Sequence, residues 1–218
     1  MTFLSDKTII SRFYDIFPMR ENDIRADKVT EPASFEMRLG GEAFLSGEKK
    51  LVKLNSKKPF LKISPGDLAI LLVKEHIEIP SDLIGFISIK LSYTNMGLIN
   101  ISGFHVDPGF KGHLTFSVYN AGPNDIILRY NEAIFLIFFA QLDQVPASLY
   151  EKSGHEHQYQ EHIQTQAMNK LGGRSVSPQS LDVRLGSLES RFQLVWGLLL
   201  ALTTGLIIAI FKVFFSNG

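Results

Sequence analysis

The sequence predicts a mainly β domain followed by an apolar C-terminal helix, and two patterns in the chain lead to this prediction. Within residues 1–145, short apolar runs alternate with turn-forming stretches such as SPGD, IPSD, DPGFKG and NAGPND. The runs are LAILLV (68–73), LIGFISI (83–89), HLTFSVYN (113–120) and IFLIFFAQL (134–142). Short strands joined by regular turns are typical of a sandwich or barrel, and not of alternating strand and helix units. Near the C-terminus, the 20 residues between Arg191 and Lys212 carry no charge.

The segment LSDKTIISRF near the N-terminus is predicted to be helical. Ser5 is placed to cap it and Asp6 falls in the first turn, where a carboxylate is favourable. Charged residues, among them Lys7 and Arg12, interrupt the apolar residues of this region. It therefore lacks the uninterrupted apolar core of a signal peptide, and we expect the β domain on the cytoplasmic side of the membrane.

Composition narrows the choice of partners. The chain has 218 residues, of which 45% are hydrophobic, enough for a full core. Lys plus Arg and Asp plus Glu number 22 each, so nucleic acid is not an expected partner. Cysteine is absent, which leaves no disulfide framework and no thiolate nucleophile or ligand. His155, His157 and His162 lie in a polar segment, and we predict no protein-held metal site there.

The uncharged run is long enough at helical rise to cross about 30 Å of hydrocarbon. We predict a single-pass C-terminal anchor over 192–215, with a buried core helix as the alternative. Arg184 and Arg191 precede the run and Lys212 follows it, a charge asymmetry that also favours a cytoplasmic domain.

Two further patterns predict self-association. Small residues recur at every fourth position of the run, which lets helices approach closely: Gly197, Ala201, Gly205 and Ala209. The alternative is chance spacing. Just before the run, four apolar residues follow a heptad-like seam: Leu181, Leu185, Leu188 and Phe192. We interpret 181–191 as a short coiled-coil or amphipathic stalk, and the polar 146–180 as an arm or linker.

Five segments, in order, resemble the dCTP deaminase and dUTPase superfamily. They are LSDKTI, EPASFEMRLGGEAF (31–44), ISPGDLAILLVKEHIEIPSDLIGFISIKLS (63–92), MGLINISGFHVDPGFKGHLTFSVYNAG (96–122) and IFLIFFAQL. The resemblance covers residues 3–142, and its most specific part is His105 to Gly122. It implies a distorted β-barrel that forms a homotrimer. It also implies active sites between subunits that bind a deoxynucleoside triphosphate with Mg²⁺.

The family's phosphate-binding motif resembles KLSYTNMG, residues 90–97. Lys90 keeps a positive charge but lacks the bidentate fork of the family's arginine. Leu91 replaces the first serine of the motif, Ser92 is retained, and Asn95 stands where a second arginine is expected. The resemblance thus makes Lys90, Ser92 and Asn95 candidate nucleotide-binding residues.

The second part of the implied site is also altered. Asp107 matches the family's aspartate and is the candidate catalytic residue, with a turn aspartate in VDPG as the alternative. Ser117 occupies the position of the deaminases' catalytic glutamate, and His105 replaces a residue that is often arginine; both are candidate nucleotide contacts. Loss of a general base typically costs about 10²- to 10⁴-fold in rate.

Three functions follow from these substitutions. The first is a membrane-anchored trimer that binds a deoxynucleotide as a sensor or regulatory module, without deaminase activity. The second is an active dUTP pyrophosphatase or a divergent dCTP deaminase that works through Asp107. The third is a trimeric scaffold that only organises the membrane helices or a protein partner.

Overall fold

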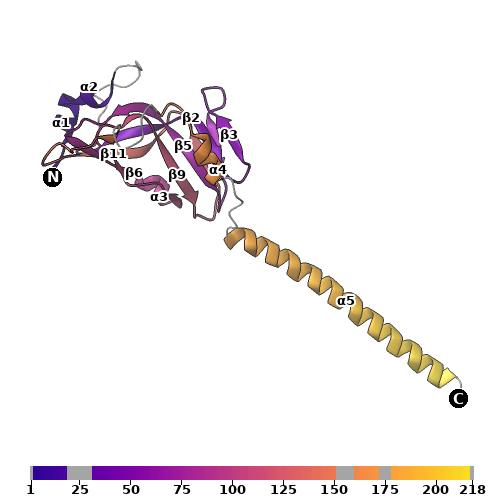
Figure 1. Ribbon diagram of the computed structural model, residues 1–218. Helices are drawn as coiled ribbons and strands as arrows, with labels where there is room; N and C mark the ends of the chain where they lie inside the picture. Colours follow the sequence, from indigo (N-terminus) through magenta and orange to yellow (C-terminus); the bar gives the residue numbers. More distant parts are fainter. Residues whose placement is uncertain (1, 19–30, 151–159, 172–177, 217–218) are drawn as a thin grey trace. The chain divides into compact units, whose positions relative to one another are not determined.

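The computed structural model describes residues 2–18, 31–150, 160–171 and 178–216. The chain divides into two units, Met1–Ser175 and Val176–Gly218 (Figure 1). The first unit is mainly β, as predicted. Each predicted strand is present: 68–73 lies in β5 (Leu68–Glu78), 83–89 is β6 (Leu83–Ile89), 113–120 lies in β9 (Lys111–Asn120) and 134–142 overlaps β11 (Ala133–Gln141).

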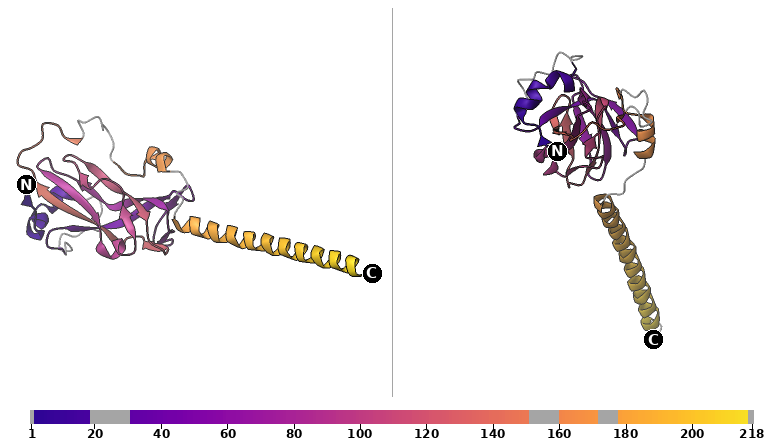
Figure 2. Two further views of the ribbon diagram at one scale, coloured as in Figure 1. Left: turned by 90° about the horizontal axis from the view of Figure 1, so that it is seen from below. Right: turned by 60° about the vertical axis from the view of Figure 1, so that its left-hand side comes forward.

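Nine strands form one antiparallel sheet, in the order β7-β9-β5-β2-β11-β6-β8. The other strands of this order are β2 (Phe35–Leu45), β7 (Leu98–Asn100) and β8 (His105–Val106). Two short strands complete the sheet: β1 (Thr2–Phe3) pairs with β11, and β3 (Lys50–Lys53) pairs with β2. A separate ribbon pairs β4 (Phe60–Ile63) with β10 (Ile126–Arg129). The large sheet curls on itself (Figure 2). Within the described residues β7 does not pair with β8, so the sheet forms a curled half-barrel, which agrees in part with the distorted β-barrel that the resemblance implies.

Alternation along β9 creates the core face of the sheet. Every second residue from Gly112 to Asn120 is buried, and the residues between them are partly exposed. Phe116 stacks on Phe135 of β11 with ring centroids 4.1 Å apart, and both rings are fully buried. A period of two that buries one set of side chains is what a strand with one covered face requires. Phe104, just before β8, is 66% exposed in this chain.

The predicted N-terminal helix forms two short helices, α1 (Asp6–Ser11) and α2 (Phe13–Ile16). Asp6 lies in the first turn as expected, but the Ser5 side chain makes no capping hydrogen bond. Ile9, Phe13 and Ile16 are buried. Arg12, between the helices, donates to both carboxylate oxygens of Asp82 at 2.7 and 2.9 Å, which ties this region to the turn before β6.

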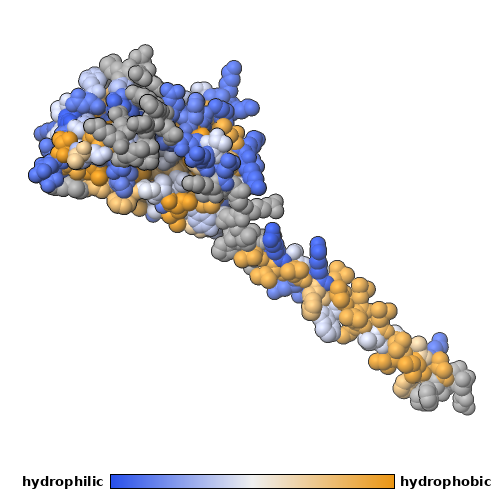
Figure 3. Space-filling model, viewed as in Figure 1, coloured by the Kyte–Doolittle hydropathy of each residue, from blue (hydrophilic) through white to orange (hydrophobic). Residues whose placement is uncertain are grey.

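The second unit is the helix α5 (Pro178–Ser216), and it includes both the predicted stalk and the predicted anchor. Its 39 residues would extend about 58 Å. The stretch Arg184–Val213, of mean hydropathy 2.4, is long and apolar enough to cross a membrane. Its apolar side chains lie on the surface (Figure 3). A span of about 20 residues fills the hydrocarbon layer, so part of α5 would extend beyond it.

Candidate functional site

The first group of predicted residues lies on and beside a single helical turn, α3 (Leu91–Thr94). The backbone N–H of Lys90, just before α3, donates to the carbonyl of Ile134 at 2.9 Å, which holds the end of β6 against β11. Ser92 and Asn95 are exposed. The ammonium group of Lys90 forms an ion pair with Glu36 of β2.

Glu36 is a site residue that the sequence analysis did not identify. It lies in a segment that resembles the family, EPASFEMRLGGEAF, but only the sheet brings it to Lys90. Because this carboxylate compensates the charge of Lys90, α3 offers weaker attraction to a triphosphate than its sequence suggested.

Tyr93 links α3 to the turn between β10 and β11. Burial raises the pKa of the Tyr93 hydroxyl, and a hydrogen bond to Glu132 raises it further. The phenol therefore stays protonated and donates to the Glu132 carboxylate at any physiological pH. This contact fixes the orientation of α3 on the sheet.

The second group is His105 and Asp107, whose Nε2 and Oδ1 atoms are 3.5 Å apart. Their side chains are 42% and 52% exposed. The preceding loop is fixed at Asn100, whose Oδ1 accepts from the Ser102 N–H at 3.1 Å, and at Ile101, whose N–H donates to the Ser117 carbonyl at 2.8 Å. Asp107 is thus held beside solvent, where a carboxylate is accessible to a ligand.

Ser117 lies on the outer face of the sheet. It is paired with Ile70 of β5, which is paired in turn with Phe44 of β2. Directly opposed residues share a face, and Ile70 and Phe44 are both buried. The immediate cross-strand surroundings of Ser117 are therefore apolar, and they supply no base to activate its hydroxyl.

One chain does not bring the two groups together. In the antiparallel pairing of β6 and β8, Gly85 is opposite Val106. Asp107 and Lys90 consequently lie six strand positions apart along this pair, roughly 20 Å at the usual rise per residue.

The segment after the β domain packs on the outer face of the sheet. Gln160 bonds β9 twice: its carbonyl accepts from the His113 N–H at 2.8 Å, and its side-chain amide donates to Thr115 Oγ1 at 2.9 Å. Ile163, 5% exposed, packs on Phe44 and Ile70. The helix α4 (Thr165–Leu171) follows. Thr115 and Ser117 point to the same face of β9, so this segment lies next to the position of the expected catalytic glutamate.

Glu42 of β2 holds this segment in place. Its carboxylate accepts from Lys53 Nζ at 2.6 Å and from the Ile163 N–H at 3.1 Å, and lies 3.0 Å from His162 Nδ1. Burial raises the pKa of Glu42, but the hydrogen bonds from Lys53 and Ile163 outweigh it and hold the pKa below its ordinary range. His155, His157 and Tyr159 lie outside the described residues.

Tyr150 packs against the turn that carries Asp107. Its N–H donates to the Pro108 carbonyl at 2.9 Å, and its ring centroid is 5.6 Å from that of Phe110. Burial raises the pKa of the Tyr150 hydroxyl, and the negative charge of Asp107 adds to the increase. An aromatic ring thus stands beside the candidate carboxylate.

The described residues offer a metal ion single carboxylates and no clustered site. Among the described residues, no three His, Asp or Glu side chains cluster as a metal site. Magnesium that arrives with a nucleotide needs only one or two carboxylates, because phosphate oxygens and water supply its other ligands. Exposed Asp107 has the donor chemistry for such an ion.

A family model described as dCTP deaminase-like matches residues 3–142. The dCTP deaminase of Pyrococcus horikoshii is 33% identical over 57% of this chain and 78% of its own length. That of Pyrococcus furiosus is 35% identical over 54% of this chain and 73% of its own length.

A solved structure supports the fold. The dCTP deaminase of Agrobacterium tumefaciens superposes with a TM-score of 0.52 at 19% identity, over 65% of this chain and 48% of that chain. The match therefore spans about half of the solved protein. The family model covers the residues in which the resemblance was found, and the chain belongs to the dCTP deaminase-like family.

Proposed function

We propose that this protein is a membrane-anchored, deoxynucleotide-binding module that has lost deaminase catalysis. Ser117, at the position of the catalytic glutamate, carries the proposal. A serine hydroxyl is no base near neutral pH unless a neighbour activates it, and Ser117 is paired with Ile70. The compensated Lys90 and the neutral Asn95 weaken phosphate binding as well. Together these features favour a ligand that is bound and released unchanged.

Assembly into a trimer would complete the site, with α3 from one copy facing Asp107, His105 and Ser117 of the next. Apolar side chains around α3 and β7 support such an interface. They are 44–72% exposed in the single chain: Leu91, Met96, Ile99, Ile101 and Phe104. A cluster of exposed apolar residues favours association with another protein surface.

Anchoring through α5 would place this module at a membrane, on the cytoplasmic side, with lipid around residues 192–215. The exposed apolar side chains of α5 support this role. Contacts among the stripe of Gly197, Ala201, Gly205 and Ala209 would join the spans of neighbouring copies. A nucleotide that rearranges the domains could then alter the packing of the spans.

Magnesium would enter with the nucleotide. When bound, the ion neutralises phosphate charge. In our proposal Asp107 holds the ion through a carboxylate oxygen, His105 contacts a phosphate or the base, and Ser92 and Asn95 donate to phosphate oxygens. Ser117 contacts the base without moving a proton.

Product analysis and calorimetry test this function together. Full-length protein in detergent is incubated with each deoxynucleoside triphosphate and Mg²⁺, and products are separated by chromatography and identified by mass spectrometry. We expect at least one nucleotide to bind and all to be recovered unchanged. Conversion of dCTP to dUTP would overturn the proposal, and so would a complete absence of binding.

A second candidate function is hydrolysis of dUTP to dUMP. The contact between His105 and exposed Asp107 favours it, because a carboxylate can orient water towards a phosphate chain. Asp107→Asn would then lower turnover by about 10²-fold or more, with binding retained. An unchanged rate in this variant would exclude the role of Asp107, and Asp143→Asn, at another exposed position, serves as the matched control.

A further inference from the structure

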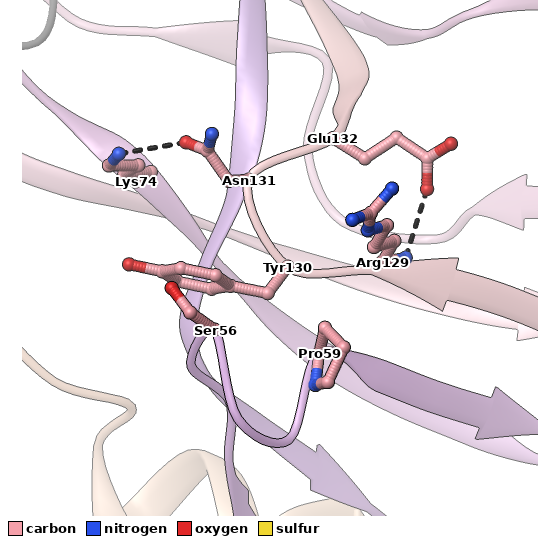
Figure 4. Close-up of a pocket in the computed structure, with 7 residues that line it drawn as sticks. All are labelled: Ser56, Pro59, Lys74, Arg129, Tyr130, Asn131 and Glu132. Carbon is pink, nitrogen blue, oxygen red and sulfur yellow. Dashed lines mark hydrogen bonds between the residues drawn. The ribbon is translucent and has the colours of Figure 1, made fainter.

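A second cavity contains none of the candidate nucleotide-binding or catalytic residues that the family resemblance implies. Its volume is about 620 Å³, within the usual range for small-molecule sites. Three segments form it (Figure 4): Ser56 and Pro59 before β4, Lys74 of β5, and the four residues Arg129–Glu132 between β10 and β11. It contains none of the residues of α3, β9 or Asp107.

The cavity is preorganised by hydrogen bonds that converge on Asn131. This residue adopts a positive φ of 66°, a left-handed conformation that asparagine tolerates. Its N–H donates to the Leu39 carbonyl at 2.9 Å, and its side-chain oxygen accepts from Lys74 at 2.7 Å and from Arg38 at 3.0 Å. Arg38 is fixed in turn by Glu75, which it contacts at 2.6 Å.

The wall opposite Lys74 is fixed too. The Tyr130 N–H donates to the Pro59 carbonyl at 2.6 Å, which joins the two walls of the cavity. The Arg129 N–H donates to Glu132 at 2.9 Å. Because the backbone is held at both points, the side chains can meet a ligand with little loss of conformational entropy.

Positive charge predominates around the cavity. Lys74 and Arg129 line it, and exposed Lys57 and Lys58 directly follow Ser56. Glu132 is the one acidic residue of the lining, and it also accepts the Tyr93 hydrogen bond. The buried Glu75 carboxylate is compensated by Arg38. The surplus of cations favours an anionic ligand.

The lining chemistry selects the kind of anion. A guanidinium group can bind two oxygens of a phosphate at once, whereas an ammonium group and hydroxyls bind phosphate oxygens singly. Lys74 and the hydroxyls of Ser56 and Tyr130 lie on one side of the cavity, and Arg129 lies on the side of Glu132 (Figure 4), so a phosphorylated ligand would be contacted from both sides. The Tyr130 ring, with the Lys74 ammonium 5.9 Å from its centroid, provides an apolar surface for the remainder of a ligand.

We propose that this cavity binds the phosphate group of a phosphorylated small molecule or lipid, at a site separate from the proposed nucleotide site. Arg129 and Lys74 hold the phosphate oxygens, and Asn131 keeps the Lys74 ammonium in position. The inference does not rest on the proposed function, because no residue of the cavity is among the candidate nucleotide-binding or catalytic residues.

Calorimetry on full-length protein in nanodiscs tests the site. The soluble probe is inorganic pyrophosphate, added to phosphatidylcholine nanodiscs, and the lipid probe is phosphatidic acid incorporated into the nanodisc and detected by crosslinking. If pyrophosphate binds and phosphatidic acid is not crosslinked to the protein, the ligand is a soluble phosphorylated molecule. If phosphatidic acid is crosslinked and pyrophosphate does not bind, the ligand is a lipid headgroup. Either result supports the proposal if it depends on the cavity.

Variants establish that dependence. Arg129→Ala should weaken binding by about tenfold or more, the usual effect of losing a charged hydrogen bond, and Lys74→Gln should weaken it as well. Lys62→Ala is the matched control, because Lys62 is an exposed lysine of neighbouring β4 that pairs with Asp125 at 3.0 Å. Unchanged binding in both cavity variants, or an equal loss in the control, would overturn the proposal, as would no binding of either probe. Equal melting temperatures confirm that the variants are folded.

Discussion

The β domain and helix α5 use the same apolar residue types in opposite ways. Leu71 and Phe139 of the sheet are fully buried, whereas Leu202 and Ile208 of α5 are 70% and 67% exposed. In the sheet, alternation turns one set of side chains towards a core that the chain itself provides. In α5 apolar residues surround the helix, and they are exposed in the single chain. The β domain is therefore stabilised by its own packing, whereas the apolar surface of α5 is not covered within that helix.

The largest expected effect comes from removing a buried ring. Phe139→Ala should lower the free energy of unfolding of the β domain by about 3–5 kcal/mol, through lost burial and the cavity left behind. Chemical denaturation in detergent measures it. Ile208→Ala in α5 is the comparison and should leave the domain unchanged; equal effects of the two would contradict the separation into two units.

A charge in α5 should act on membrane association and not on the domain. Leu202→Arg, in the middle of the uncharged run, should cost about 2.5–3.5 kcal/mol of insertion. We expect more protein in the soluble fraction after carbonate extraction, with the domain still folded. Ser190→Arg, before the run, should fractionate as the wild type does. If both variants remain in the membrane equally, α5 is not the anchor.

The segment at 160–169 lies between these extremes, since it is docked by few contacts. Ile163→Ser removes a buried side chain from Phe44 and Ile70 and should weaken docking by about 2 kcal/mol. Hydrogen exchange of the amides at 160–169 should then be about 30-fold faster, while exchange in β9 beyond His113 is unaffected. Gln164→Ser is the exposed control. Unchanged exchange in Ile163→Ser would show that this side chain does not hold the segment.

The smallest effect is expected at the ion pair between Arg12 and Asp82. The Arg12 hydrogen bond lowers the pKa of Asp82 below its ordinary value of 3.8. The pair therefore stabilises the fold above that value, and its contribution is lost as the pH falls through the folded pKa. Arg12→Met should cost about 1 kcal/mol at pH 7 and less at pH 3.

Urea unfolding at both values of pH measures the Arg12 effect. Lys7→Met, at an exposed position of the N-terminal region, should leave the free energy of unfolding unchanged at both values of pH. If the free energies of unfolding of wild type and Arg12→Met differ more at pH 3 than at pH 7, the ion pair between Arg12 and Asp82 does not stabilise the fold in this way.

The sequence by itself determined the β class, the approximate extents of the four strands, the family and the apolar helix. These depend on local alternation, turn residues and motif order, which can be recognised without knowing which strands pair. That Ser117 stands at the position of the deaminases' catalytic glutamate stays a prediction from the resemblance. The sequence did not determine that Ser5 makes no capping bond or that the curled sheet remains open, because both depend on contacts with other segments.

Only the tertiary structure decided which charges meet. Glu36 lies 54 positions from Lys90 in sequence, and Lys74 lies 57 from Asn131; strand pairing alone brings each pair together. The same is true of Gln160 and Ile163 in the segment interpreted as an arm or linker, whose partners on β9 and β2 only the folded sheet specifies. Electrostatic and packing energies depend on distances in space, whereas the sequence specifies only positions along the chain.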